Sequence, residues 1–492
     1  MKDNPVGNEG MGHASLSRRG FLFATGAGSL VAGAASAQSG ESVPVTAEYD
    51  IIVCGGGTSG IPAAVAAARE GARVAVIERY GFLGGNVAFS IMPCWHHLGD
   101  HHSGLLTQFA RQVEAFGVGP APLKEGNHIE PEAVKILFLT LATDQRVQLY
   151  LHHFITGAVK EGNRITTVIT ESKSGRRAFR AKCFIDASGD GDLCCHAGAK
   201  FNLGVQGETQ GMALRFRVGY VDFDKFADWA ARQPKDLSLG DMVKTVRNGG
   251  GKSWGKAFYF GSRLDRLYDQ HRSKYPDLPS NTYFNCSSIR PNELSINTTR
   301  VYDLDGTNAD DLTKAEIVMR KQAWAVWRFL KENVPGFDAS VITETAIQAG
   351  VRESRTIVGD STLTVDDGAK NREFEDSVQT CRVTFDSHDQ QHYETGGNKG
   401  LVDVPWGVFL PQGLDGVLTA GRCTSCDHLM NSTFRRMENS FQSGEAAGTA
   451  AAMAVKKGLA PRHLPVAELK AQLRKNGFKT CQKDRQEQQK RT

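Results

Sequence analysis

The residues best suited to catalysis or ligand binding are polar side chains late in the chain, namely His388, His428 and Arg435. A histidine titrates near pH 6.5, so it can accept a proton from a substrate at neutral pH. An arginine presents a planar fork of donors that binds a carboxylate or an oxyanion through two hydrogen bonds. These residue types suit proton transfer beside an anion clamp, if the fold brings them to one pocket.

Two further groups of residues have open interpretations. His96, His97, His101 and His102 stand in one run with Asp100, and such residues can ligate a metal. No second ligand cluster of recognisable spacing accompanies them, which argues against a metal site. Cys423 and Cys426 form a C-x-x-C pair that can exchange electrons.

A glycine-rich stretch early in the chain predicts the element that positions a ligand. The apolar run 51–54 suits a buried parallel strand, and Gly55, Gly57 and Gly60 follow it in G-x-G-x-x-G register. An alanine-rich helix is expected over residues 61–70, and a second strand over residues 74–77. Glu78 lies 18 residues after Gly60, near the roughly 20-residue spacing of the carboxylate that binds a ribose hydroxyl. The whole unit predicts a dinucleotide site.

The first 40 residues have the character of an export signal. Arg18 and Arg19 form a twin-arginine pattern, an apolar run covers residues 21–35, and Ala35-Ser36-Ala37 is an A-x-A cleavage site. The run is too short and too rich in glycine and alanine to span about 30 Å of hydrocarbon. We therefore expect the protein to be exported by the twin-arginine route, which carries folded proteins, to the periplasm or the medium.

Composition narrows the class of protein further. A formal net charge of +4 over 492 residues is near balance and argues against a nucleic-acid partner. Several of the 10 cysteines stand in apolar strand contexts, and a chain of this length does not need disulfides for stability, so we interpret most of them as buried free thiols. No second glycine motif follows a strand, which argues against a nicotinamide site.

The order of expected elements indicates an α/β protein with an inserted domain. Strands are expected over residues 147–154, 165–171 and 181–185, and helices over residues 104–116, 129–142, 312–332 and 444–457. We predict a signal peptide (1–40), a dinucleotide-binding domain in two parts (47–204 and 401–460), a substrate domain of α+β type (205–400) and a basic C-terminal tail (461–492).

At this point the chain resembles the FAD-dependent oxidoreductases that have a glutathione-reductase-like FAD domain. It is most similar to a bacterial branch with a strand ending in D-A-T/S-G-D-G-D, an R-E-S-R segment and a late A-G-R-C block. The matching residues are Gly55 to Gly60, Glu78, Gly84-Gly85, Asp186 to Asp192, Arg352 to Arg355, Ser387 to Asp389, Ala420 to Cys423 and Gly444 to Gly448. The resemblance implies a Rossmann-like parallel sheet that binds FAD.

The resemblance also implies which residues surround the cofactor. The glycine turn would hold the pyrophosphate, Glu78 the adenosine ribose, and a helix that begins near Glu445 would point its N-terminus at the flavin. The residues expected at the cofactor are Gly55, Gly57, Thr58, Ser59, Gly60, Glu78, Arg79, Gly84, Gly85, Asn86, Asp190, Gly421, Glu445 and Ala446.

The family layout further suggests where the substrate binds. It places His428 toward the pocket, where it can take the hydroxyl proton as a hydride leaves for flavin N5, with His388 as a second candidate base. It also places the histidine-rich run beside the flavin, and His97 is our candidate there. Arg435 would hold the substrate. Arg436 and Glu438, by contrast, are charged where the family usually has apolar residues and proline.

The expected function is that of an exported FAD-dependent dehydrogenase or oxidase acting on a small hydroxylated molecule. Its partners would be that substrate and an external electron acceptor: oxygen, a quinone or a carrier protein. A homo-oligomer stays open. The alternative is a flavin-dependent lyase, hydratase or isomerase without net redox change, in which His428 and Arg435 act as acid/base and anion clamp.

Overall fold

The structure is a computed structural model that describes residues 43–93, Trp95, 104–117, 129–233, 260–263, 265–280, 283–389, 395–396 and 400–489. All of these belong to one structural unit, Val43–Thr492. The expected export signal and residues 96–102, including the candidate His97, lie outside the described residues.

A seven-stranded sheet forms the base of the pocket, in the order β3-β2-β1-β6-β5-β4, with β18 also paired to β6. Its strands are β1 (Val45–Cys54), β2 (Val74–Ile77), β3 (Gln148–Tyr150), β4 (Phe154–Glu161), β5 (Arg164–Ser172), β6 (Gly175–Asp186) and β18 (Val417–Thr419). Strand β6 pairs antiparallel with β5 along its first half and parallel with β18 along its last residues. The sheet is therefore mixed: a parallel group around β1 and an antiparallel ribbon on one side.

The parallel group forms where the sequence is apolar. Ile51, Ile52, Val53 and Cys54 are fully buried and pair with both β2 and β6, whereas the earlier residues of β1 are partly exposed. Such continuous burial is typical of a strand covered on both faces. Because β1, β2 and β6 run parallel, the loops that follow Cys54, Ile77 and Asp186 meet at one edge of the sheet.

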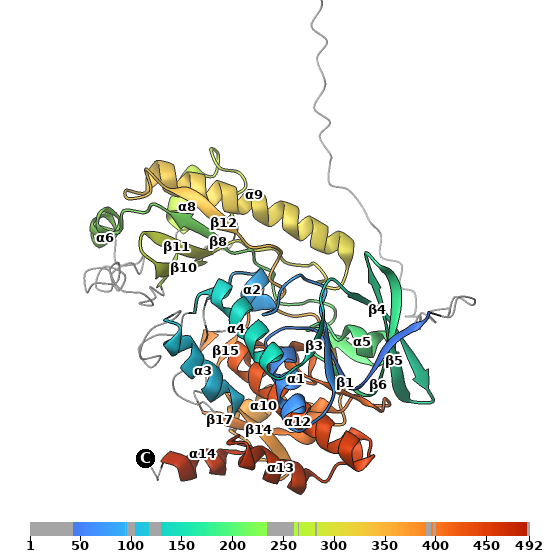
Figure 1. The fold of residues 1–492 in the computed structure, drawn as a ribbon. Helices are drawn as coiled ribbons and strands as arrows, with labels where there is room; N and C mark the ends of the chain where they lie inside the picture. Colours follow the sequence, from blue (N-terminus) through green and yellow to red (C-terminus); the bar gives the residue numbers. More distant parts are fainter. Residues whose placement is uncertain are drawn as a thin grey trace, which may run out of the picture. The chain divides into compact units, whose positions relative to one another are not determined.

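Two helices of small residues cover one face of this sheet at close range. They are α1 (Gly60–Arg69) and α12 (Met437–Lys457), labelled near the centre of Figure 1. A Cβ atom on Gly444 would lie 2.0 Å from the Ser59 carbonyl oxygen, and one on Gly448 would lie 2.1 Å from that of Ala63. The helix backbones therefore touch where glycine occurs at positions i and i+4, which lie on the same helix face.

A second, antiparallel sheet lies in the inserted part of the chain. Its order is β12 (Val341–Thr345), β8 (Phe216–Gly219), β11 (Glu293–Asn297), β10 (Tyr283–Arg290) and β9 (Phe260–Arg263). The long helix α9 (Ala309–Asn333) runs along it (Figure 1), and Asn308 caps this helix by accepting from the Asp310 and Asp311 N–H groups. A separate hydrophobic core, with Phe216, Phe329 and Phe337 among its members, joins the two.

A buried ion cluster connects the second sheet to helix α4 (Pro131–Asp144). The Arg217 guanidinium contacts the Glu130 carboxylate at 2.9 Å and that of Glu344 at 3.1 Å, and Arg290 contacts Glu130 at 2.9 Å. Glu130 is also the N-cap of α4, and Pro131 occupies the first helical position, where a proline is favoured.

The remaining elements are shorter and complete the layers. They are α2 (Asn86–Phe89), α3 (Leu105–Ala115), α5 (Asp192–His196), α6 (Phe223–Ala231), α8 (Asp265–His271), α10 (Val365–Ala369), α11 (His428–Phe434), α13 (Val466–Lys475), α14 (Gln482–Gln489), β7 (Phe201–Leu203), β13 (Arg355–Ile357), β14 (Ser377–Arg382), β15 (Phe385–Asp386), β16 (Thr395–Gly396), β17 (Leu401–Pro405) and the 3₁₀ turns η4 (Trp406–Phe409), η5 (Gly421–Cys423) and η6 (Pro461–His463).

Two predicted elements are wrong in their bounds. The single strand expected over residues 147–154 is two strands, because the chain turns at His152, which has a φ of +59°. The helix expected to begin near Glu445 begins at Met437. Its first turns hold polar residues that carry no apolar signal, yet these are buried and bonded; the Asn439 amide, for instance, donates to the Thr433 carbonyl at 2.9 Å.

The cores also bear on the domain layout. The sequence predicted that the inserted domain ends near residue 400. In the structure, apolar residues between Leu363 and Val383, which precede that boundary, pack into the core of the seven-stranded sheet. The basic C-terminal segment packs there as well, through Leu469 and Leu473. In the part of the chain that the structure describes, no helix combines the length and the apolar character needed to cross a membrane.

The contact between α1 and α12 makes a prediction about stability. Replacing Gly with Ala at a free helix position stabilises by about 1 kcal/mol. We expect Gly448→Ala to do the opposite and lower the free energy of unfolding by about 1–3 kcal/mol, the usual cost of overpacking. Denaturant unfolding of the purified protein measures this. Lys456→Ala, at an exposed position of the same helix, is the control, and a stabilised Gly448→Ala variant would contradict the packing argument.

Candidate functional site

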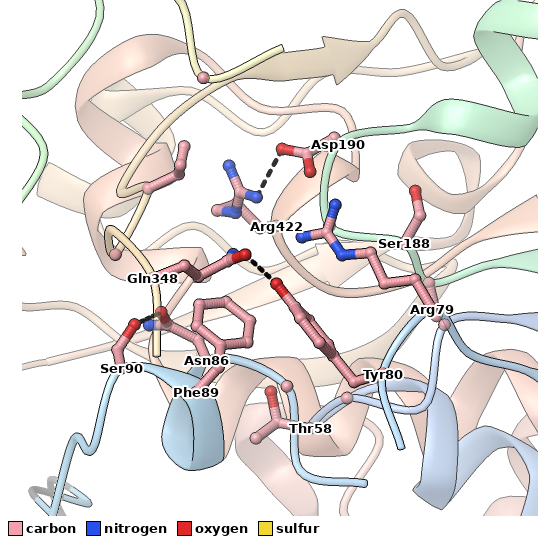
Figure 2. A pocket seen from close by; sticks show the side chains of 18 of the residues that line it. Thr58, Arg79, Tyr80, Asn86, Phe89, Ser90, Ser188, Asp190, Gln348 and Arg422 are labelled. Carbon is pink, nitrogen blue, oxygen red and sulfur yellow. Dashed lines mark hydrogen bonds and ion pairs between the residues drawn. The ribbon is translucent and has the colours of Figure 1, made fainter. Parts of the chain in front are cut away.

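The candidate site is a pocket at the edge where the parallel strands β1, β2 and β6 end. The loops after these strands line it together with α2 and with segments of the inserted part. Figure 2 shows Thr58, Arg79, Asn86, Asp190 and Arg422 around this space. Ligands of α/β sheets bind at this edge.

The glycine turn shows three different steric demands. Gly55 has a φ of +110°, and a Cβ atom there would lie 2.4 Å from the Ala187 carbonyl oxygen. A Cβ on Gly60 would lie 1.8 Å from the Gly55 carbonyl oxygen. At Gly57, in contrast, the nearest atom is the Gly85 Cα at 3.6 Å. Gly55 and Gly60 thus permit close protein packing, whereas Gly57 lines the pocket and leaves its backbone open to a ligand.

Glu78 lies at the end of β2 and lines the pocket. Its carboxylate accepts hydrogen bonds from the backbone N–H groups of Gly56 at 2.7 Å and Tyr80 at 2.9 Å. Burial raises the pKa of Glu78, although these two hydrogen bonds and Arg79 oppose the shift. The backbone bonds hold the side chain in one orientation, and a carboxylate has lone pairs left to accept a ligand hydroxyl.

A buried charged cluster holds the loop after β6. The Arg422 guanidinium donates to Asp190 at 2.7 Å and to the Ser354 hydroxyl at 2.7 Å, and that hydroxyl donates to Asp190 at 2.7 Å. Burial opposes ionisation of Asp190, but Arg422 and Arg79 keep its pKa below the usual value. Figure 2 shows Arg422 pointing at Asp190. Ser354 and Arg422 stand in the R-E-S-R and A-G-R-C motifs, but the sequence analysis gave neither a role.

A second carboxylate of the same loop behaves differently. Asp192 contacts the Arg355 guanidinium at 2.6 Å, which by itself would lower its pKa. Burial and the neighbouring Asp190 and Asp186 outweigh that contact and raise the pKa of Asp192 to about 7. Asp192 also lines the pocket, so the sequence analysis missed a titratable group there.

One contact joins the two parts of the chain across the pocket. The Tyr80 hydroxyl donates to the Gln348 side-chain oxygen, and Figure 2 shows the two side chains meeting in the middle of the view. Tyr80 stacks on Phe82 with ring centroids 5.2 Å apart and packs against Phe89. The aromatic contacts hold Tyr80 in place, so the pocket wall includes residues of both parts. Sequence patterns gave no signal for this pair.

His428 is at the start of α11, and carboxylates flank both of its ring nitrogens. Nδ1 lies 2.8 Å from Glu353 Oε2, and Nε2 lies 3.1 Å from Asp389 Oδ1. Burial alone would lower the pKa of His428, but the bonds to Asp389 and Glu353 raise it to about 10. The ring is therefore a cation at neutral pH and is not among the pocket-lining residues. This geometry opposes the predicted role of His428 as a general base.

His388 lies in a different environment. Its Nε2 is 3.2 Å from Asp386 Oδ1, and the side chain is 7% exposed. Burial and the charges of Arg352 and Arg300 lower the pKa of His388 well below its usual value, so the ring is neutral at pH 7. A neutral imidazole can accept a proton, yet His388 is not among the residues that line the pocket.

Arg435 does line the pocket. Its guanidinium donates to the Asp386 carbonyl oxygen at 2.8 Å and lies 3.4 Å from both Asp386 Oδ2 and Gln210 Oε1. The structure therefore brings Arg435 and the predicted cofactor residues Gly57, Glu78 and Asp190 to one cavity. Other predicted residues on its wall are Gly55, Thr58, Ser59, Arg79, Gly85 and Asn86.

Five predicted cofactor residues lie outside this wall: Gly60, Gly84, Gly421, Glu445 and Ala446. Glu445 is two turns into α12, where both carboxylate oxygens accept from the Leu105 N–H at 3.0 and 2.9 Å. Burial raises the pKa of Glu445 to about 8. Since α12 begins at Met437, Glu445 and Ala446 do not form its N-terminus; Ser440, in its first turn, reaches the pocket instead.

Gly84 and Gly421 contact the glycine turn but do not line the pocket. Gly84 donates its N–H to the Gly56 carbonyl at 2.9 Å. Gly421 has a φ of +81°, and a Cβ atom there would lie 2.5 Å from the Ser59 hydroxyl oxygen. Cys423 and Cys426 lie nearby as free, buried thiols whose pKa values burial raises. A high thiol pKa does not favour the redox interpretation of this pair.

One protein family matches most of this chain. A family model described as FAD dependent oxidoreductase matches residues 50–473. No curated protein matches the sequence. Solved structures to which the chain is similar include a geranylgeranyl bacteriochlorophyll reductase-like protein from Thermoplasma acidophilum, with 14% identity, a TM-score of 0.42, and 88% of this chain and 84% of that chain covered.

Two other solved structures are similar at the same level. The anhydrotetracycline hydroxylase OxyS from Streptomyces rimosus has 14% identity and a TM-score of 0.46, covering 87% of this chain and 68% of that one. The p-nitrophenol 4-monooxygenase PnpA from Pseudomonas putida DLL-E4 has 11% identity and a TM-score of 0.44, covering 87% and 85%. The extent of the family match settles the assignment: this chain belongs to the FAD dependent oxidoreductases, enzymes with FAD as cofactor.

Proposed function

We propose that the chain is an exported dehydrogenase or oxidase that removes a hydride from a small hydroxylated substrate and passes the electrons to oxygen or to an external carrier. The observation that carries this proposal is the extent of the pocket, which continues from the glycine turn past Phe89 to Arg352 and Arg435. Residues of the large sheet and of the inserted part both line this space, so we propose that cofactor and substrate share it. A glutathione-reductase type of FAD domain is part of the same proposal.

The residues on the wall fit FAD. Gly57 offers bare backbone at the N-terminus of α1, where partial positive charge favours a pyrophosphate. Glu78 is held by two backbone N–H groups and would accept a ribose hydroxyl. Arg79 and Asp190 would lie near the linker, and Gly85 and Asn86 near the ring end. FAD, when bound, supplies an acceptor for a hydride at N5.

The side chains of this protein must then orient the substrate and take one proton. An alcohol that loses a hydride also loses its hydroxyl proton. His388 is the predicted histidine that its surroundings keep neutral, and its ring does not line the pocket, so we propose that it accepts the proton through one bridging water. Its backbone carbonyl accepts from the Gly211 N–H at 3.0 Å, and Arg352 donates to the Gly211 carbonyl at 2.6 Å, which ties His388 to the pocket wall.

The alternative without net redox change has no observation in its favour. It relied on His428 as acid and base, and that ring is flanked by Glu353 and Asp389. A group with a pKa near 10 is a poor proton shuttle at neutral pH.

The redox proposal is tested by mixing the FAD-loaded mature protein anaerobically with a panel of hydroxylated compounds. We expect at least one of them to bleach the flavin absorbance, because hydride transfer reduces it, and air or a quinone to restore the colour. Dithionite serves as the control that the flavin is reducible. A flavin that dithionite bleaches and no compound in the panel reduces would refute the proposal.

The proposed pyrophosphate contact is tested at Gly57. Gly57→Ala adds a methyl group that the protein tolerates but that occupies ligand space, so we expect FAD affinity to fall about tenfold or more, equal to about 1.4 kcal/mol. Thermal unfolding of the apoprotein should stay unchanged. Gly157→Ala, in β4 with similar room, is the matched control and should bind FAD normally. Unchanged FAD affinity in Gly57→Ala would contradict the assignment.

Export is tested with the full precursor in a bacterial host. Replacing both residues of the pair, Arg18→Lys with Arg19→Lys, should abolish delivery to the periplasm, since the twin-arginine route reads this pair. Cell fractionation and immunoblotting measure it, with Lys2→Arg as the control. Equal periplasmic amounts in all three proteins would exclude this route.

A further inference from the structure

Five of the described arginines line the pocket, and two of them, Arg79 and Arg422, belong to the proposed nucleotide side. The other three come from separate parts of the chain: Arg215 precedes strand β8, Arg352 belongs to the segment before β13, and Arg435 ends α11. The sequence predicted a substrate role for Arg435 alone. Only the tertiary structure brings all three to the wall of one pocket.

The carboxylates on the pocket wall have partners of their own. Among the described lining residues these are Glu78, Asp190 and Asp192. Glu78 accepts from backbone N–H groups, Asp190 from Arg422, and Asp192 from Arg355. All three follow strands β2 and β6, at the proposed nucleotide side. The described carboxylates of the wall therefore lie on the loops after β2 and β6, where Arg79 and Arg422 accompany them.

Arg352 and Arg435 approach the same short stretch of backbone. Arg352 donates to the Gly211 carbonyl at 2.6 Å, and Arg435 lies 3.4 Å from the side-chain oxygen of the preceding residue, Gln210. Arg435 is also held by Asp386, whereas its Nε is buried and has no hydrogen-bond partner among the described residues. A buried guanidinium donor without a partner is costly, and an anion that reached it would relieve the cost.

The pKa of His388 reflects the positive charge of neighbouring arginines. The charges of Arg352 and Arg300, together with burial, lower the pKa of His388 even though Asp386 faces it. Asp386 contacts both Arg435 and His388 and so offsets part of the positive charge. A region where positive charge prevails at low dielectric attracts anions.

We infer that Arg352 and Arg435 form the binding site for a carboxylate on the substrate, which makes the substrate a small hydroxy acid. This inference rests on the proposed function. With FAD bound, the C–H bond at the hydroxyl carbon would break, and its hydrogen and two electrons would pass to the cofactor. The hydroxyl proton would pass to His388 through the bridging water, and a C=O bond would form. The product would be an oxo acid, and the two electrons would go on to the external acceptor.

A phosphate of FAD is the other anion that these arginines can bind. The two sources differ in what a variant loses. If the arginines serve the cofactor, removing one releases FAD. If they serve the substrate, FAD content stays normal and affinity for the carboxylate falls.

The test uses the FAD-loaded mature protein and α-hydroxyisobutyrate, which has the carboxylate and the hydroxyl but no hydrogen at the hydroxyl carbon. Its neutral amide is the matched probe. Binding is followed by the shift of the flavin visible spectrum and by thermal unfolding, so that turnover is not needed. Variants are Arg435→Gln and Arg352→Gln, with exposed Arg176→Gln as the control of equal charge change.

We expect the acid to bind and the amide not to bind. Each pocket variant should keep its FAD and lose about 10- to 100-fold in acid affinity, as expected for a lost hydrogen bond between charged groups. The Arg176→Gln protein should match the parent. Using two variants keeps the test valid if one of them fails to fold.

Several outcomes would overturn the inference. They are equal binding of acid and amide, release of FAD from both variants with acid selectivity retained, or the same loss in Arg176→Gln. The proposed function fails separately. If neutral alcohols bleach the flavin as well as hydroxy acids do, hydride transfer stands and the carboxylate site falls. If the acid binds through both arginines and no hydroxy compound bleaches the flavin, the site stands and hydride transfer falls.

Discussion

The pocket depends on backbones that approach each other more closely than any side chain permits. Helix α1 is held between the loop after β1, at Gly60, and helix α12, at Gly444 and Gly448. In each contact a Cβ atom would lie about 2 Å from a carbonyl oxygen of the facing backbone. Because α1 cannot move away from either neighbour, its N-terminus stays at the mouth of the glycine turn, where an anion binds.

A single four-residue segment connects the chemistry of the two parts. Within residues 352–355, Glu353 contacts His428, Ser354 contacts Asp190 and Arg422, and Arg355 contacts Asp192. Glu353 thus contacts α11, whereas Ser354 and Arg355 both contact the loop after β6. Residues 352–355 lead from the inserted part back to the large sheet. They therefore hold in place both the loop after β6, where we propose that FAD binds, and helix α11.

Charge states in this site follow from neighbours more than from residue type. His428 and His388 both lie near carboxylates, yet the pKa of His428 is raised and that of His388 is lowered. His428 has a carboxylate at each ring nitrogen, whereas His388 is more deeply buried and faces two arginines. Asp190 and Asp192 differ in the same way, since Arg422 outweighs burial for one and burial outweighs Arg355 for the other.

The sequence by itself determined the local unit: the strand at residues 51–54, the glycine register, helix α1, the second strand and Glu78, because these depend on short-range steric and periodic patterns. It also indicated the family. It could not show that α12 begins at Met437, since those first turns are polar and become helical only when buried against partners. Nor could it show that His428 is flanked by two carboxylates, or that Arg215 and Arg352 join Arg435. Those features come from residues far apart in the chain, which only the tertiary structure brings into contact.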